Sequence, residues 1–162
     1  MDKKETFITA IKANEGLIYK IASIYTDSTE DRKDLIQEII YNLWKSFGSF
    51  NQQSSLSTWM YRVAMNVAIY HLKITKRKVS TVPIDGHDLN FHDTDNNDFE
   101  EKLKIFRQYL DHLNLLDKGI VMLYLENKSY GEIAEIVGIS ESNVGTKLSR
   151  IKEKFKKQIL KK

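Results

Sequence analysis

The sequence contains no cysteine, a single proline and seven glycines among its 162 residues, and it has no long apolar run. Without cysteine, the chain cannot form a disulfide, a thiolate zinc site or a cysteine nucleophile. It offers no stretch of about 18 apolar residues to span a bilayer, and its first residues, MDKKETFITAIK, lack the apolar core of a signal peptide. We therefore expect a cytoplasmic protein whose stability comes from packing.

The scarcity of proline and glycine leaves few positions at which a long helix must end. Apolar residues recur at helical spacing, and a hydrophobic content of 41% is enough to bury a core. The sequence predicts an all-α protein with helices at about 4–25, 29–47, 56–76, 99–112, 116–126, 130–137 and 141–159. Because residues 80–100 are rich in Pro, Gly, Asn and Asp, we expect two small helical domains, 1–79 and 101–162, joined by a flexible acidic linker.

Charge is distributed unevenly along the chain, although the formal net charge is only +3. Residues 51–80 carry five Lys or Arg and no acid, whereas residues 81–101 carry seven Asp or Glu and no Lys or Arg. Residues 129–162 carry eight basic and four acidic side chains. The order along the chain is therefore basic, acidic, basic, and the acidic segment should be repelled by DNA.

The stretch SYGEIAEIVGIS, residues 129–140, contains two helix starts and one helix stop. Ser129 and Glu132 have the spacing of a capping box, which begins a helix. Gly138 can take the left-handed conformation that ends this helix, and Ser140 can cap the next one. Two helices joined by about three residues, with the small Ala134 where they approach each other, form a helix-turn-helix.

An αα-hairpin in an ordinary bundle would share this turn and the apolar stripe that follows it. The polar face of the second helix favours DNA binding instead, because short polar and basic side chains there can reach base edges and phosphates. This face comprises Ser142, Asn143, Thr146, Lys147, Arg150 and Ser149. The lysines beyond residue 151 extend the positive charge, but by themselves they fit a solvated face equally well.

The predicted helix at 29–47 has two distinct sides. Its buried side comprises Leu35, Ile36, Ile39, Ile40, Leu43 and Phe47. Its polar side comprises Asp34, Gln37, Glu38, Tyr41 and Lys45. By periodicity alone, this polar side is more often exposed to solvent than used to bind a partner.

The predicted helix at 56–76 is unusually apolar. Its expected buried stripe comprises Leu56, Trp59, Met60, Val63, Val67, Tyr70 and Ile74, with Arg62, Asn66, Lys73 and Lys76 along one edge. Further apolar residues, Tyr61, Met65, Ala68 and Leu72, face away from this stripe, so the helix should be covered on more than one side. An acid-free segment with aromatic and basic residues also suits single-stranded nucleic acid, although this signal alone is weak.

These residues match a known family. The stretch DLIQEIIYNLWKSFGSFNQQSSLSTWMYRVAMNVAIYHLKITKRK resembles domain 2 of bacterial RNA polymerase sigma factors, and LLDKGIVMLYLENKSYGEIAEIVGISESNVGTKLSRIKEKFKK resembles their domain 4. The two stretches cover most of the chain. The length and the absence of intervening domains resemble the extracytoplasmic-function (ECF) group of the sigma-70 family, in which only these two domains remain.

The resemblance implies roles for particular residues. Asp34, Gln37 and Glu38 match the family's D-L-x-Q-E stretch, which docks on the β′ clamp helices of core RNA polymerase. Binding of the −10 promoter element falls on Asn51, Gln52, Gln53, Ser54 and Ser55 in a loop and on Arg62, Asn66, Lys73, Lys76 and Arg77 in the following helix. Reading of the −35 duplex falls on Ser142, Asn143, Thr146, Lys147 and Arg150. The resemblance also implies contact with the β subunit and a partner anti-sigma factor.

Two departures from the family pattern stand out. The family often has R-x-A-R-N where this chain has Arg62-Val63-Ala64-Met65-Asn66, so one positive charge is missing. Domain 4 commonly opens with Leu-Pro, whereas this chain has Leu113-Asn114-Leu115-Leu116, which concerns helix capping.

Two other classes of protein are the alternatives. A stand-alone helix-turn-helix regulator would account for the downstream motif but would not need both the docking face and the acid-free helix upstream. An enzyme is disfavoured, because the four histidines are scattered and the sequence has neither a Gly-rich phosphate loop nor a nucleophile motif. We expect no catalytic residue, no metal site and no cofactor, although His87 with Asp88 and His92 with Asp93 lie in the predicted linker.

Overall fold

The computed structural model describes the backbone of residues 2–78 and 97–160 and the side chains of residues 2–74 and 105–160. The chain folds into two compact units. The first contains α1 (Lys3–Ala13), α2 (Glu15–Tyr25), α3 (Thr29–Ser46), the 3-10 turn η1 (Phe47–Ser49) and α4 (Leu56–Lys78). The second contains α5 (Asn97–His112), α6 (Leu115–Leu125) and α8 (Glu141–Leu160), and α7 (Tyr130–Val137) leads into α8.

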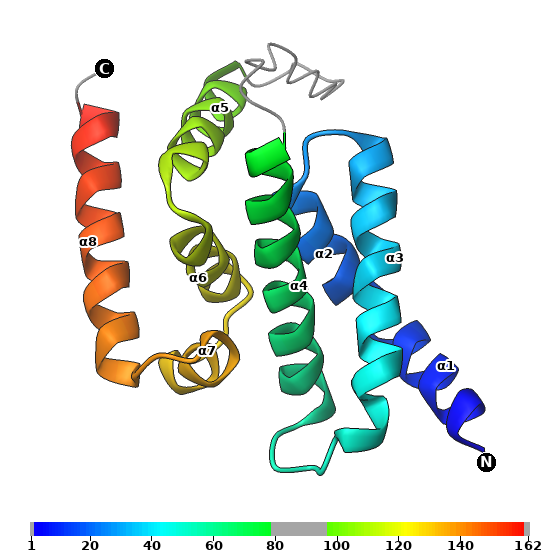
Figure 1. Cartoon of the computed structure of the whole chain (residues 1–162). Coiled ribbons are helices and arrows are strands. Elements are labelled where there is room, and N and C mark those ends of the chain that lie inside the picture. Colours follow the sequence, from blue (N-terminus) through cyan, green and yellow to red (C-terminus); the bar gives the residue numbers. More distant parts are fainter. Residues whose placement is uncertain (1, 79–96, 161–162) are drawn as a thin grey trace. The chain divides into compact units, whose positions relative to one another are not determined.

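Helices make up all the regular structure of the described residues, which confirms the all-α prediction (Figure 1). Six of the seven predicted helices agree with the structure to within about two residues at each end, the usual uncertainty of a helix boundary. Of the predicted linker, residues 80–96 lie outside the described residues, as do the two His-Asp pairs, whereas residues 97–100 form the first turn of α5.

The single helix predicted at 4–25 is wrong, because the structure has two helices there, α1 and α2. They meet at Asn14, whose φ of −123° and ψ of 20° are not helical. The Asn14 side-chain amide donates a hydrogen bond to the Ala10 carbonyl at 2.9 Å, and its backbone N–H bonds to the Ile11 carbonyl. A short polar side chain that bonds the preceding turn in this way competes with continuation of the helix.

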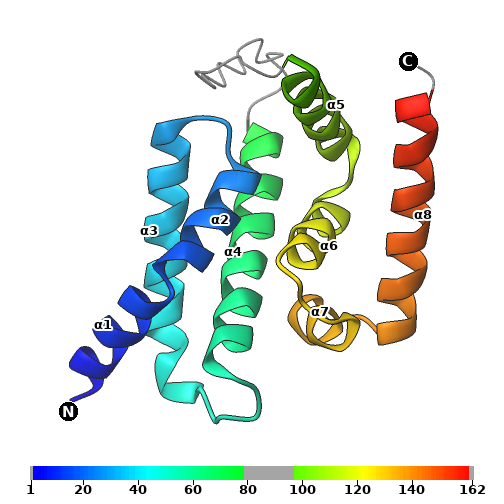
Figure 2. The same cartoon turned by 180° about the vertical axis from the view of Figure 1, so that it is seen from behind.

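The core of the first unit lies among α2, α3 and α4, which all contact one another. Figure 2 shows α2 lying across α3 and α4. The largest fully buried side chains of this core are Ile18, Ile21, Leu35, Ile39, Leu43, Met60 and Met65. Helix α1 is attached by edge-to-face aromatic contacts, because Phe7 packs against Trp44 and Phe47 at centroid distances of 5.1 and 5.3 Å.

The stripe predicted to be buried on α4 is partly wrong. Tyr70 is 67% exposed, whereas Tyr61, Met65 and Ala68, which were predicted to face away, are buried. Ala64 and Ala68 are fully buried, and both lie on the same side of α4. Small side chains can be buried where helices approach closely, so the large apolar side chains did not by themselves mark the buried side. The expectation that α4 is covered on more than one side is not affected.

The second unit has its own core. Tyr109, Val121 and Ile151 are buried together, with Phe106, Leu110, Leu113 and Phe155 packed against them. The Tyr109 hydroxyl donates a hydrogen bond of 2.8 Å to the Ile151 carbonyl and so connects α5 to α8. Burial, followed by the negative charge of Asp117, raises the pKa of Tyr109 above its usual 10.0, so the phenol stays protonated.

Candidate nucleic-acid and partner interfaces

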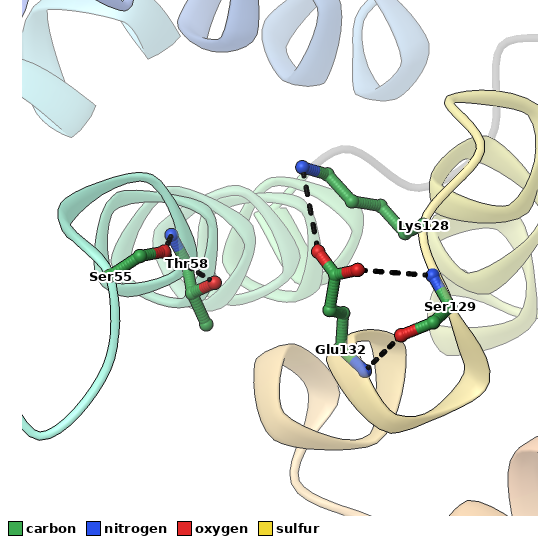
Figure 3. Close-up of polar contacts among 5 residues, drawn as sticks. All are labelled: Ser55, Thr58, Lys128, Ser129 and Glu132. Carbon is green, nitrogen blue, oxygen red and sulfur yellow. Dashed lines mark hydrogen bonds and ion pairs between the residues drawn. The ribbon is translucent and has the colours of Figure 1, made fainter.

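Local hydrogen bonds build the helix-turn-helix that was predicted from helices at 130–137 and 141–159. Ser129 accepts a 3.1 Å hydrogen bond from the Glu132 N–H, and Glu132 accepts one of 3.4 Å from the Ser129 N–H (Figure 3). Gly138 has a φ of +80°, as predicted for the residue that ends α7. Ser140 then accepts a 3.1 Å hydrogen bond from the Asn143 N–H at the start of α8. The predicted caps and the turn are confirmed.

The predicted apolar stripe orients α8. Val144, Leu148 and Ile151 are buried, and Phe155 is half-buried against the core of the unit. A Cβ atom added at Gly145 would lie 3.5 Å from Cε2 of Tyr130, which is an ordinary van der Waals contact, so the packing of α8 does not require a glycine there.

With the stripe buried, the opposite face of α8 is open. Four of the five residues predicted to read a duplex are exposed: Ser142, Asn143, Thr146 and Arg150. Lys147 differs from them, because it is half-buried and its Nζ lies 3.2 Å from Oδ1 of Asp117, near the start of α6. Its ammonium group is thus already engaged within the protein, whereas the other four side chains are displayed outward.

The polar side of α3 forms one wall of a shallow depression. Asp34, Gln37 and Glu38, the predicted docking residues, are all exposed and line it together with Tyr41 and His71. His71 comes from α4, and its Nδ1 lies 2.7 Å from Oε2 of Glu38. Sequence reasoning gave His71 no role, because only packing of α3 on α4 brings position 71 beside position 38.

The segment 50–55 connects η1 to α4 and is built by short-range contacts. Asn51 accepts a hydrogen bond from the Gln53 N–H at 3.2 Å, and Gln52 has a φ of 62°, in the left-handed region. Ser55 caps α4, because its Oγ accepts a 3.1 Å hydrogen bond from the Thr58 N–H and donates one to Thr58 Oγ1 (Figure 3). Asn51, Gln52 and Gln53 are exposed, as is Ser55, and Ser54 is half-buried.

On α4, Arg62, Asn66 and Lys73 are exposed and lie at helical spacing on one face. Lys76 and Arg77 belong to α4, but their side chains lie outside the described residues. Met65, which stands where the family pattern often has a second arginine, is 1% exposed. Position 65 therefore faces the core. The arginine that is missing there does not remove a charge from the exposed face of α4.

The start of α6 accounts for the missing proline at position 114. Asn114 accepts a 2.8 Å hydrogen bond from the Asp117 N–H and acts as the N-cap. A side-chain cap satisfies an orphan backbone donor that a proline at the helix start would not satisfy. Among the described residues, no helix is both long and apolar enough to cross a membrane, and no cluster of three or more His, Cys, Asp or Glu could hold a metal ion.

The chain combines a helix-turn-helix that has an open polar face with a helical unit that has a basic helix face and an exposed polar depression. This combination is typical of a two-part nucleic-acid-binding protein. Residues 10–78 match the family model of Sigma-70 region 2, and residues 103–155 match that of Sigma-70, region 4. The chain belongs to the sigma-70 family of RNA polymerase sigma factors, in its extracytoplasmic-function group. Members of this family are transcription initiation factors and not enzymes.

Similar proteins support this assignment. The RNA polymerase sigma factor SigV of Bacillus subtilis is 27% identical over 99% of this chain and 98% of its own length. The ECF RNA polymerase sigma-E factor of Haemophilus influenzae is 28% identical over 86% of this chain and 82% of its own length. The fold is similar to that of the sigma factor RpoE, solved in complex with the anti-sigma factor NepR from Bartonella quintana, with a TM-score of 0.69, 18% identity and coverage of 96% of this chain and 95% of that one.

Proposed function

We propose that this chain is a sigma factor that binds core RNA polymerase, recognises the −10 and −35 promoter elements and so starts transcription at its own set of promoters. The observation that carries this proposal is that one chain contains, in this order, both matching sigma regions. A stand-alone helix-turn-helix regulator is disfavoured, because region 2 and its exposed Asp34, Gln37 and Glu38 would then have no use.

The first step of the proposed mechanism is docking on the polymerase. Asp34, Gln37 and Glu38 are exposed, and none of them belongs to the buried side of α3. They can therefore make contacts with β′ without disturbing the core. The 2.7 Å contact with His71 restricts the Glu38 carboxylate before any partner arrives, which lowers the entropy lost on binding.

The second step is recognition of the −35 duplex by α8. Ser142, Asn143 and Thr146 supply short hydrogen-bonding side chains near the start of this helix, and Arg150 supplies a charge one turn later. The N-terminal residues of a recognition helix are those that reach base edges in the major groove. We assign Lys147 to the same site with a smaller share of the phosphate binding, because contact with DNA has to compete with its ion pair to Asp117.

The third step is capture of the −10 element by the first unit. Asn51, Gln52, Gln53, Ser54 and Ser55 in the loop and Arg62, Asn66, Lys73, Lys76 and Arg77 in α4 form the proposed surface. An unpaired base held there stabilises the open duplex without nucleotide hydrolysis. Flipping a base costs a few kcal/mol, which the contacts of this surface have to offset.

Two further parts of the proposal concern the partners and the place of action. We propose that an anti-sigma factor binds this chain, in keeping with the solved complex of RpoE with NepR. We also propose that the chain acts in the cytoplasm, where core polymerase and promoter DNA meet.

The deciding experiment is run-off transcription with purified bacterial core polymerase, with and without this protein, on a library of the source organism's genomic fragments. Discrete transcripts that appear only with the protein are expected. Absence of such transcripts, together with no co-purification of the protein with core polymerase, would favour the stand-alone regulator.

A further inference from the structure

The ion pair of Lys147 and Asp117 joins α8 to the start of α6. The Lys147 Nζ lies 3.2 Å from Oδ1 of Asp117, and the two side chains keep 28% and 18% of their surface exposed. Lys147 comes one helical turn after Asn143 and three residues before Arg150, so it borders the open polar face of α8. The pair therefore stands at the edge of the surface that is proposed to meet DNA.

We propose that Asp117 sets the strength of DNA binding, because it holds Lys147 on a carboxylate that a DNA phosphate has to displace. The proposal rests on the proposed function, since it takes α8 as the helix that meets the −35 duplex. It adds to that function a residue that acts only through Lys147 and needs no contact with DNA. Asp117 is thus a positioning residue with a negative effect on affinity, and removal of its charge should strengthen binding.

Asp117 is fixed in a way that Lys147 is not. It lies in the first turn of α6, where its backbone N–H donates a 2.8 Å hydrogen bond to Oδ1 of the N-cap Asn114. The helix dipole stabilises a carboxylate at this end of a helix. A lysine has a flexible four-carbon stem and can turn toward a phosphate. Such a turn would leave the Asp117 carboxylate, which is mostly buried, without this cation and close to a charge of its own sign.

The cost of this exchange falls on the part of DNA binding that does not depend on sequence. Phosphate contacts carry no sequence information directly, and they supply nearly all of non-specific binding. The side chains proposed to read bases, Ser142, Asn143 and Thr146, are exposed and take no part in the pair. Asp117 should therefore lower the affinity of the free protein for DNA in general and leave base reading to the open face of α8.

The test uses the full chain and a fluorescent mixed-sequence duplex of about 20 base pairs, which is two helical turns. The variants are Asp117→Asn, which keeps the size of the side chain and removes its charge, Lys147→Ala, and the two combined. Asp111→Asn is the matched control, because it removes the same charge from the same unit and breaks a 3.4 Å ion pair with Lys118 that does not involve α8. Fluorescence anisotropy gives the affinity between about 50 and about 200 mM salt.

Asp117→Asn should bind the duplex about three-fold more tightly at the lowest salt concentration, a change typical of a partly exposed ion pair. The slope of log K against log salt concentration should steepen by about 0.9, the value for one additional neutralised phosphate. Lys147→Ala should weaken binding much more in the Asp117→Asn background than in the wild type. A partly unfolded variant would bind less DNA, so a loss of stability cannot imitate this gain.

Unchanged or weaker binding by Asp117→Asn would overturn the proposal. So would an equal gain in Asp111→Asn, or a gain that persists when Lys147 is replaced by alanine. Run-off transcription by wild-type holoenzyme, together with no gain in Asp117→Asn, would refute the role of Asp117 alone. A gain that requires Lys147, without any run-off transcription, would refute only the sigma function.

Discussion

Two glycines give a direct test of how the turn of the helix-turn-helix is formed. A Cβ atom added at Gly138 or at Gly16 would meet nothing within 4 Å, so neither substitution by alanine creates a clash. The two backbones differ. Gly138 has a φ of +80°, whereas Gly16 is in the first turn of α2.

Opposite effects on stability are therefore expected. Gly138→Ala puts a side chain in the left-handed region and should lower the free energy of unfolding by about 1 to 2 kcal/mol. For a unit of this size, a loss of about 1 kcal/mol lowers the unfolding midpoint by about 4 to 8 °C. Gly16→Ala should raise the free energy of unfolding by about 0.5 kcal/mol, since alanine is the better helix former and the position is close to the helix end.

Urea unfolding, followed by far-UV circular dichroism, gives the free energy of unfolding of both variants. Fluorescence emission from Trp44 and Trp59, the two tryptophans of the chain, reports separately on the first unit. Gly138→Asn serves as a further control, because asparagine tolerates the left-handed region better and should lose less stability than alanine. Changes of the same sign in Gly138→Ala and Gly16→Ala would refute the reasoning from backbone conformation. So would equal losses in Gly138→Ala and Gly138→Asn.

Three other predictions follow from individual side chains. Arg150→Ala should weaken binding to the −35 duplex and reduce the slope of log K against log salt concentration by about 0.9 for each phosphate that is no longer neutralised. Lys147→Ala should change that slope less, and Glu153→Ala should not weaken binding. Equal slopes for the wild type and Arg150→Ala would refute the assigned face. The triple variant Asp34→Ala, Gln37→Ala and Glu38→Ala should stay folded by circular dichroism but fail to co-purify with core polymerase, and retained co-purification would contradict the docking assignment. Tyr109→Phe should lose about 1 kcal/mol at pH 7 with its hydrogen bond to Ile151. Because the pKa of Tyr109 is raised on folding, its contribution to the free energy of unfolding is present below pH 10.0 and is lost as the pH rises through the folded-state pKa. Above pH 10.0, the free energy of unfolding should therefore fall more steeply for the wild type than for Tyr109→Phe. Parallel curves of this free energy against pH would refute the reasoning.

Features that depend on neighbouring residues were predictable from the sequence. Ser129 with Glu132, Gly138, and Ser140 each act over three or four residues, so their spacing alone predicted the caps and the turn that the structure has. The stripe of Val144, Leu148 and Ile151 was predictable for the same reason, because helical periodicity fixes which side chains share a face. The open polar face of α8 follows from that stripe.

The tertiary structure alone decided which side of α4 is buried and what several polar residues contact. On a helix with apolar residues on more than one side, periodicity cannot choose the buried face; packing within the unit buried Ala64 and Ala68 and left Tyr70 exposed. The pairs Lys147–Asp117 and Glu38–His71 join residues that are 30 or more positions apart, a distance over which local spacing carries no information. Apart from the break at Asn14, the sequence by itself therefore determined the helices, the caps and the turn of the helix-turn-helix, because these depend on short-range hydrogen bonds. Packing between helices determined which polar and aromatic side chains are free to meet DNA or the polymerase.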